Sequence, residues 1–209
     1  MNESIPRKER ERVFRRNEIQ TAASKLFALK GFNSTTLEEI AESAEFGKGT
    51  IYNYFQNKEE IYFSIIEDVL ENTSKILEKS DKLSKSLQEF VKLYIDQIFN
   101  YCIENKFSYL IFVREIAHFD PIFTKEKNES LINYHNLSQK ILTKQFKNAL
   151  KEDVIKPFET KKVINFFIHV VFPYVHYLLL CTPVEEINIK AETDFISEIL
   201  LSGMLSDKS

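Results

Sequence analysis

The side chains best suited to specific hydrogen bonding lie around two glycines, Gly47 and Gly49. Ile51 and Phe55 follow at a spacing of four, so they share one side of a short helix and are expected to face a core. The other side of that helix would expose Lys48, Thr50, Tyr52, Asn53 and Tyr54. Ammonium, hydroxyl and amide groups presented in this way favour hydrogen bonds to bases and phosphates.

Two helix starts flank this segment. Thr36 and Glu39 have the spacing of a capping box, in which each side chain bonds the other residue's backbone N–H. Lys58 follows Asn57 at the start of a second helix. Because the N-terminal end of a helix attracts anions, Thr36 and Lys58 are candidate phosphate contacts. Simple capping by Thr36 and solvent exposure of Lys58 are the alternatives.

The helices that must position these side chains are predicted from the spacing of apolar residues. From Ile19 to Phe27 these residues form one helical stripe, and Gly31 ends that helix. The chain holds only four glycines and five prolines, which predicts an all-α protein with about nine helices in total. Further stripes predict helices over about 37–44, 50–55, 58–79, 83–102, 107–119, 131–150, 161–181 and 190–205.

The formal net charge of the chain is −3, but the charges are unevenly distributed. Residues 1–16 carry six Lys and Arg side chains against three Glu, whereas residues 1–60 carry ten basic and ten acidic side chains. The positive charge of the N-terminal part is therefore concentrated in a basic arm. Such an arm is either a solvated, frayed tail or a phosphate-binding segment, and the sequence leaves both open.

Several protein classes are disfavoured. No Gly-rich phosphate loop, HExxH or CxxC motif occurs, so we expect neither an enzyme nor a cofactor or metal site. Cys102 and Cys181 lie among apolar neighbours and are expected to be buried, reduced thiols. The start of the chain lacks a secretory-signal pattern, which indicates a cytoplasmic protein. Val163–Cys181 nears the length of a membrane span, but Asn165 and His169 interrupt it, so a subunit interface is preferred.

The segment GFNSTTLEEIAESAEFGKGTIYNYFQNKEEIY, residues 31–62, closely resembles the DNA-binding head of the TetR family of one-component regulators. The resemblance rests on TT-x-x-x-IA, KGTIYNYF and NKEE at the family's spacing, and it covers about residues 15–65. It implies a basic arm and a three-helix DNA-binding domain with a helix-turn-helix over 1–60. An effector-binding and dimerisation domain would follow over 61–209, where only the pattern of helices matches.

The resemblance also implies roles for single residues. Lys48, Gly49, Thr50, Tyr52 and Asn53 match positions that approach bases or the adjacent sugar-phosphate, and Thr36, Tyr54 and Lys58 match positions that usually hold phosphates. Two residues depart from the family pattern. Glu45 replaces a small glycine and must tolerate an unusual backbone angle or a differently shaped turn. Gly47 replaces a capping Ser or Thr, which weakens phosphate binding and leaves the basic arm to offset the loss.

The implied function is a ligand-responsive repressor that a small, largely apolar effector releases from double-stranded operator DNA. The protein would act as a homodimer through its last two helices, with no membrane partner. A helical adaptor that binds no operator is the alternative. His169 and His176 share a helical face, but ordinary hydrogen bonds are preferred to a metal site. The candidate effector pocket comprises Tyr94, Ile98, Tyr101, Phe112, Arg114, His118, Tyr134, Phe167 and His169.

Overall fold

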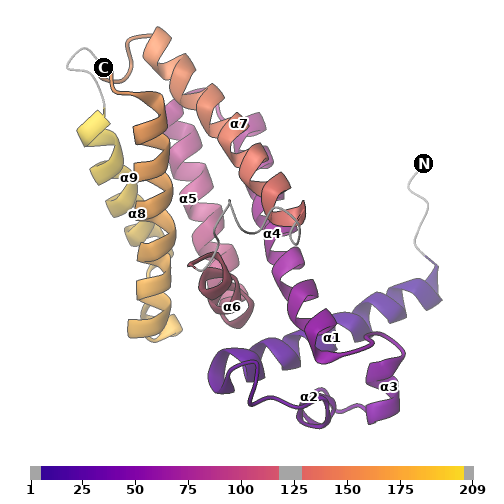
Figure 1. Ribbon diagram of the computed structural model, residues 1–209. Coiled ribbons are helices and arrows are strands. Elements are labelled where there is room, and N and C mark those ends of the chain that lie inside the picture. Colours follow the sequence, from indigo (N-terminus) through magenta and orange to yellow (C-terminus); the bar gives the residue numbers. More distant parts are fainter. Residues whose placement is uncertain (1–5, 118–128, 205–209) are drawn as a thin grey trace. The chain divides into compact units, whose positions relative to one another are not determined.

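The computed structural model of the protein describes residues 6–117 and 129–204. These residues form nine α-helices and one short 3-10 helix, Val184–Glu186, which confirms the all-α prediction (Figure 1). The α-helices are α1 (Arg7–Lys30), α2 (Leu37–Ser43), α3 (Lys48–Tyr52), α4 (Lys58–Leu83), α5 (Leu87–Glu104), α6 (Lys106–Ala117), α7 (Glu129–Lys151), α8 (Thr160–Cys181) and α9 (Ile189–Met204).

The chain divides into two compact units. The first unit lies within Met1–Val69 and Phe107–His118, so it contains α1, α2, α3, the first part of α4, and α6. Helix α6 belongs to this unit although the preceding α5 belongs to the other one. The largest buried side chains of the first unit include Ile19 and Phe27 of α1, Ile40 of α2, Ile51 of α3, Phe55, Ile61 of α4 and Tyr109 of α6.

Helix α1 begins at Arg7, well before the apolar stripe that predicted it. Its first turns are exposed, and opposite charges stabilise them at the spacings where helical neighbours meet. Glu9 pairs with Arg12 at 4.0 Å, and Glu11 pairs with Arg15 at 2.8 Å. The basic arm is therefore helical from Arg7, and its charges project from a regular surface.

The turn between α2 and α3 is built around a residue in the left-handed region. Glu45 has a φ of +58°. Its N–H donates to the carbonyl oxygen of Glu42 (3.1 Å), and the N–H of Phe46 donates to that of Ala41 (2.9 Å), the pairing of a Schellman motif. This finding confirms that Glu45 tolerates an unusual backbone angle. Glycine would adopt the same angle without the steric cost of a Cβ.

The second unit lies within Leu70–Lys106 and Phe119–Ser209. Helix α5 contacts α7, α8 and α9, and α7 contacts α8, so α5 is the central helix of this unit (Figure 1). Side chains of α5 such as Phe90, Ile95 and Ile98 are fully buried. The unit also holds a polar link, because Lys144 and Gln145 of α7 donate hydrogen bonds to the carboxylate of Asp81 in α4.

Helix α8 is apolar over most of its surface. By length and composition it is the one helix among residues 6–117 and 129–204 that could cross a membrane. One side, including Val171 and Val175, is buried, whereas Tyr177 and Leu180 on the other side are exposed. The expectation of a buried thiol is correct for Cys102 and wrong for Cys181, which lies at the exposed end of the helix.

Replacing Glu45 by glycine is expected to stabilise the protein. Relief of about 1 kcal/mol of left-handed strain should raise the melting temperature by about 2–4 °C in a chain of this size. Circular dichroism during heating measures the change. Glu42→Gly is the matched control, because it introduces glycine inside α2 and should lower the melting temperature. An equal decrease in both variants would contradict the strain at position 45.

Candidate nucleic-acid interface

Helix α3 presents a polar face because its apolar side chains are buried. Ile51 is 0% exposed and Phe55, just after the helix, is 1% exposed. Tyr52 is 50% exposed, and Asn53 is also exposed. The structure thus places the eight residues of the predicted interface in the first unit, with Lys48 and Gly49 also exposed and Thr50 and Tyr54 half-buried. The expected exposure is confirmed for Lys48, Tyr52 and Asn53 and only in part for Thr50 and Tyr54, while the role of all eight residues in binding stays a prediction.

The start of α3 lacks the hydroxyl cap that the family pattern would supply. Gly47 is the N-cap residue and makes no side-chain hydrogen bond. A Cβ at Gly47 or Gly49 would meet no atom within 4 Å, so both glycines border open space. The space beside both glycines is therefore open to an approaching group.

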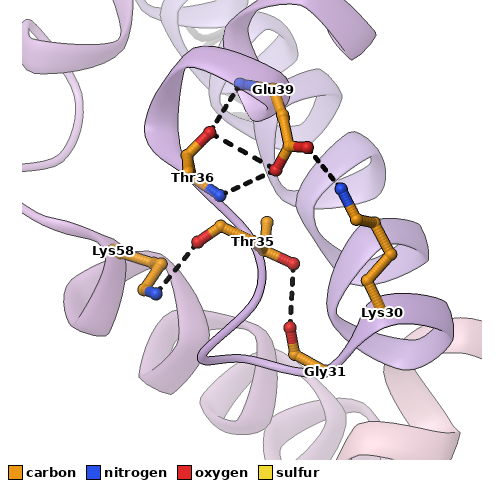
Figure 2. Close-up of polar contacts among 6 residues, drawn as sticks. All are labelled: Lys30, Gly31, Thr35, Thr36, Glu39 and Lys58. Atoms are coloured by element: carbon orange, nitrogen blue, oxygen red, sulfur yellow. Dashed lines mark hydrogen bonds and ion pairs between the residues drawn. The ribbon is translucent and has the colours of Figure 1, made fainter.

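The predicted capping box at the start of α2 is confirmed (Figure 2). The N–H of Glu39 donates to Thr36 Oγ1 at 3.2 Å, and the N–H of Thr36 donates to Glu39 Oε2 at 3.0 Å. Lys30 of α1 also pairs with the Glu39 carboxylate. This pair, together with the hydrogen bond from the Thr36 backbone N–H, lowers the pKa of Glu39. Thr36 is exposed, so its hydroxyl lies at the surface while it caps the helix.

Lys48 forms an ion pair with Glu38 across the α2–α3 turn. The hydrogen bond from Lys48 lowers the pKa of Glu38 below 4.5, and the same contact raises the pKa of Lys48. Both side chains are exposed, so salt and competing anions weaken the pair. A phosphate group that binds Lys48 would compete with Glu38 for its ammonium group.

Lys58 does not extend into solvent, which was the alternative to a phosphate contact. It is half-buried, and its Nζ donates to the carbonyl oxygens of Phe32 (2.8 Å) and Thr35 (2.9 Å). Figure 2 shows the contact with Thr35. The Nζ also lies 4.3 Å from the centroid of the Phe32 ring. Lys58 therefore joins the start of α4 to the loop between α1 and α2.

Two further side chains fix α1 against the rest of the first unit. Sequence reasoning placed Arg16 only in the basic arm and gave Gln20 no role. The guanidinium carbon of Arg16 lies 4.3 Å from the centroid of the Phe55 ring, and Arg16 Nη1 donates to the carbonyl oxygen of Tyr54 at 3.4 Å. Gln20 Nε2 donates to Asp68 Oδ2 of α4 at 2.6 Å. A cation at the end of the basic arm was the available signal for Arg16.

Part of the candidate effector pocket comes together in the second unit. The rings of Tyr94 and Phe167 lie 5.9 Å apart, and the Tyr134 phenol interacts with the hydroxyl groups of Thr73 and Tyr94. Burial raises the pKa of Tyr134. Ser138 Oγ lies near this phenol, buried and without a partner at hydrogen-bond geometry. Ile98 is fully buried on the same helix as Tyr94. Sequence reasoning missed the two hydroxyl groups of Thr73 and Ser138.

Of the other candidate pocket residues, Tyr101 lies on α5, Phe112 and Arg114 on α6, and His169 on α8. Phe112 and Arg114 lie on α6, in the first unit. Tyr101 is half-buried near the end of α5. His169 is exposed on α8, with its Nδ1 2.7 Å from the carbonyl oxygen of Asn165. His118 lies outside the described residues.

Sequence comparison places the first unit in a known family. Residues 19–65 match the family model of the bacterial regulatory proteins, tetR family. The chain is 34% identical over 84 residues to YfiR, an HTH-type transcriptional regulator of Bacillus subtilis, and the match spans only 40% of the length of that relative. YhgD of the same bacterium is 26% identical over 149 residues, which cover 69% of this chain and 74% of YhgD.

Solved structures resemble the chain over nearly its whole length. KstR2, a ketosteroid transcriptional regulator of Mycobacterium tuberculosis, matches with a TM-score of 0.78 at 18% identity over 92% of this chain and 96% of its own. FadR from Bacillus subtilis, solved with stearoyl-CoA, matches with a TM-score of 0.70 at 21% identity over 90% and 98%. These likenesses show the fold. The family match shows a tetR-family segment over residues 19–65, and the solved structures show that the chain as a whole has the fold of these regulators.

Proposed function

We propose that the protein regulates transcription by binding double-stranded operator DNA through the exposed face of α3. One observation carries this proposal. Burial of Ile51 and Phe55 holds α3 so that Tyr52 and Asn53 face solvent, within the segment that the family model matches. The major groove of B-DNA admits a helix and displays a distinct pattern of donors and acceptors for each base pair. The Asn53 amide, the Thr50 hydroxyl and the Tyr52 phenol would contact base edges.

The groups around α3 would hold the phosphate backbone. The backbone at Gly49 could approach a phosphate closely, because a Cβ there would meet no atom within 4 Å. The hydroxyl groups of Thr36 and Tyr54 would donate to phosphate oxygens, and Lys48 would exchange the Glu38 carboxylate for a phosphate. Residues 1–60 would thus bind DNA, while residues 61–209 would bind the effector and the second subunit.

The second subunit would cover the exposed apolar side of α8 and α9. Tyr177 and Leu180 of α8 are 59% and 61% exposed, and Phe195 and Ile199 of α9 are 49% and 51% exposed. Residues at such spacings share one side of their helix. A two-fold symmetric contact between identical faces would bury these side chains in both subunits. Such a dimer places two copies of α3 about 34–36 Å apart when it reads half-sites one helical turn apart.

A small, largely apolar effector would bind in the second unit between α5, α7 and α8. Tyr94, Tyr134 and Phe167 come together there and would supply an apolar lining with hydroxyl groups if their packing opened around a ligand. FadR was solved with stearoyl-CoA, and KstR2 of Mycolicibacterium smegmatis, 24% identical over 155 residues, is a transcriptional repressor. The name of KstR2 supports repression, and the stearoyl-CoA bound to FadR supports a largely apolar effector. The ligand would release DNA because it binds the DNA-free shape more tightly than the DNA-bound shape.

Asn53→Ala tests base recognition by α3. The variant should bind a duplex selected by the wild-type protein from a randomised pool roughly tenfold to a hundredfold more weakly, because a good base contact is worth about 1–3 kcal/mol. Binding to unrelated DNA should change little. Fluorescence anisotropy with both duplexes measures the difference. Asn148→Ala, at an exposed position of α7, is the control. Equal losses on both duplexes, or no loss on the selected one, would contradict base contact by Asn53.

Leu180→Glu tests the proposed dimer. A carboxylate buried in an apolar interface without a partner opposes association, so the variant should sediment as a monomer where the wild-type protein sediments as a dimer. Leu83→Glu is a matched control, because Leu83 of α4 is 59% exposed and lies outside α8 and α9. Sedimentation velocity at several concentrations measures both. A Leu180→Glu variant as dimeric as the control would rule out this face as the interface.

A further inference from the structure

An open groove lies in the second unit, between the end of α4, the first half of α5 and the start of α9. Its volume is about 470 Å³, within the range of roughly 300–1,000 Å³ that is typical of ligand pockets. Leu83 and Leu93 supply apolar surface. The groove shares no residue with the cluster of Tyr94, Tyr134 and Phe167, so it is a candidate site separate from the proposed effector pocket.

Two hydroxyl groups at this groove have no hydrogen-bond partner among the residues that the structure describes. Thr193 of α9 is 6% exposed, and Ser84, which follows α4, is half-buried. Both residues line the groove, and both side-chain oxygens are buried and unbonded. Buried hydroxyl groups are normally bonded, because an unbonded one loses the hydrogen bonds that water would make. A ligand in the groove would supply the partner that the protein lacks.

Charges of both signs line the groove. Glu89 and Asp96 lie on α5, and Lys190 lies on α9. None of the three forms an ion pair with another described residue. Asp96 is half-buried, and its carboxylate accepts one hydrogen bond, from Asn100 Nδ2 at 3.3 Å. A ligand that carries both a positive and a negative group would therefore find an unpaired partner for each on facing helices.

The groove would remain open to ligands in the proposed dimer. Lys92 and Asp194 join α5 to α9 there at 3.5 Å, and both are more than half exposed, so the pair is weak and a ligand can compete with it. Successive residues of a helix are turned by about 100°. Thr193 therefore faces a different side of α9 from Phe195 and Ile199, the side chains that would meet the second subunit.

We propose that this groove binds a small zwitterion with an ammonium group, a carboxylate and a short aliphatic part, as in an aliphatic amino acid. Its ammonium group would donate to Asp96. Its carboxylate would pair with Lys190 and accept a hydrogen bond from the Thr193 hydroxyl. The aliphatic part would pack on Leu83 and Leu93. This site goes beyond the proposed function, because binding there requires neither DNA nor the effector.

Titration of the full chain with free leucine tests the proposal, with the amide NMR spectrum as the readout. The amide signals of Leu93 and Thr193 should shift. Two analogues are matched controls: 3-methylbutylamine lacks the carboxylate, and 4-methylpentanoate lacks the ammonium group. Each should bind at least about tenfold more weakly than leucine, because one charged contact is lost. An analogue that binds as tightly as leucine overturns the proposal, and so does the absence of shifts up to about 10 mM leucine.

Thr193→Val and Ser197→Ala separate a ligand contact from a structural role. Both changes remove a buried, unbonded hydroxyl group from α9, but Ser197 does not line the groove. Neither should lower the melting temperature, because neither hydroxyl bonds the protein. Thr193→Val should weaken leucine binding about tenfold, whereas Ser197→Ala should leave it unchanged. Equal affinities in the two variants overturn the role of Thr193.

Asp96→Asn provides a second variant that keeps the size of the side chain and removes its charge. It should also bind leucine at least about tenfold more weakly, since the ammonium group would lose its ionised acceptor. This result is expected even if Thr193→Val fails to fold. Leucine affinity that is unchanged in Asp96→Asn overturns the proposed site.

Discussion

The burial of Ile51 and Phe55 is the constraint on which the proposed interface depends. Helix α3 has only five residues, and a helix this short has no stability of its own in water. Tertiary contacts therefore hold it, and they also decide which side faces solvent. Arg16 packs over Phe55 and donates a hydrogen bond to the carbonyl oxygen of Tyr54, so α1 also contacts the residues that follow α3. The polar face exists because the apolar face is anchored.

Electrostatic balance distinguishes the two parts of the proposed DNA surface. Around α2 and α3, Lys30 and Lys48 are paired with Glu39 and Glu38, so this region offers specific hydrogen bonds more than net positive charge. The helical arm from Arg7 to Arg16 carries six basic against two acidic side chains, whereas residues 1–60 as a whole carry equal numbers of each. Non-specific attraction to DNA would come from the arm, while base recognition would come from α3. The absence of a hydroxyl cap at Gly47 fits this division.

The sequence predicted the features that depend on local patterns. Helical spacing and the Thr36 capping box are each set within a few residues, and the structure has both. At Glu45 the resemblance left an unusual backbone angle or a differently shaped turn open, and the structure shows the unusual angle. The contacts of Lys58 with Phe32 and Thr35 join residues more than twenty positions apart, which no local pattern encodes. The grouping of α6 with the first unit and the convergence of Thr73, Tyr94 and Tyr134 are likewise products of tertiary packing.

Photocrosslinking from α3 tests the central claim most directly. A photoreactive phenylalanine analogue would replace Tyr52, which is 50% exposed on α3, or Tyr177, which is 59% exposed on α8. Each protein would be irradiated with a duplex selected by the wild-type protein. The account predicts a protein–DNA crosslink from position 52 and none from position 177. DNA that is bound but crosslinks from neither position, or equally from both, would contradict the claim that α3 faces the duplex.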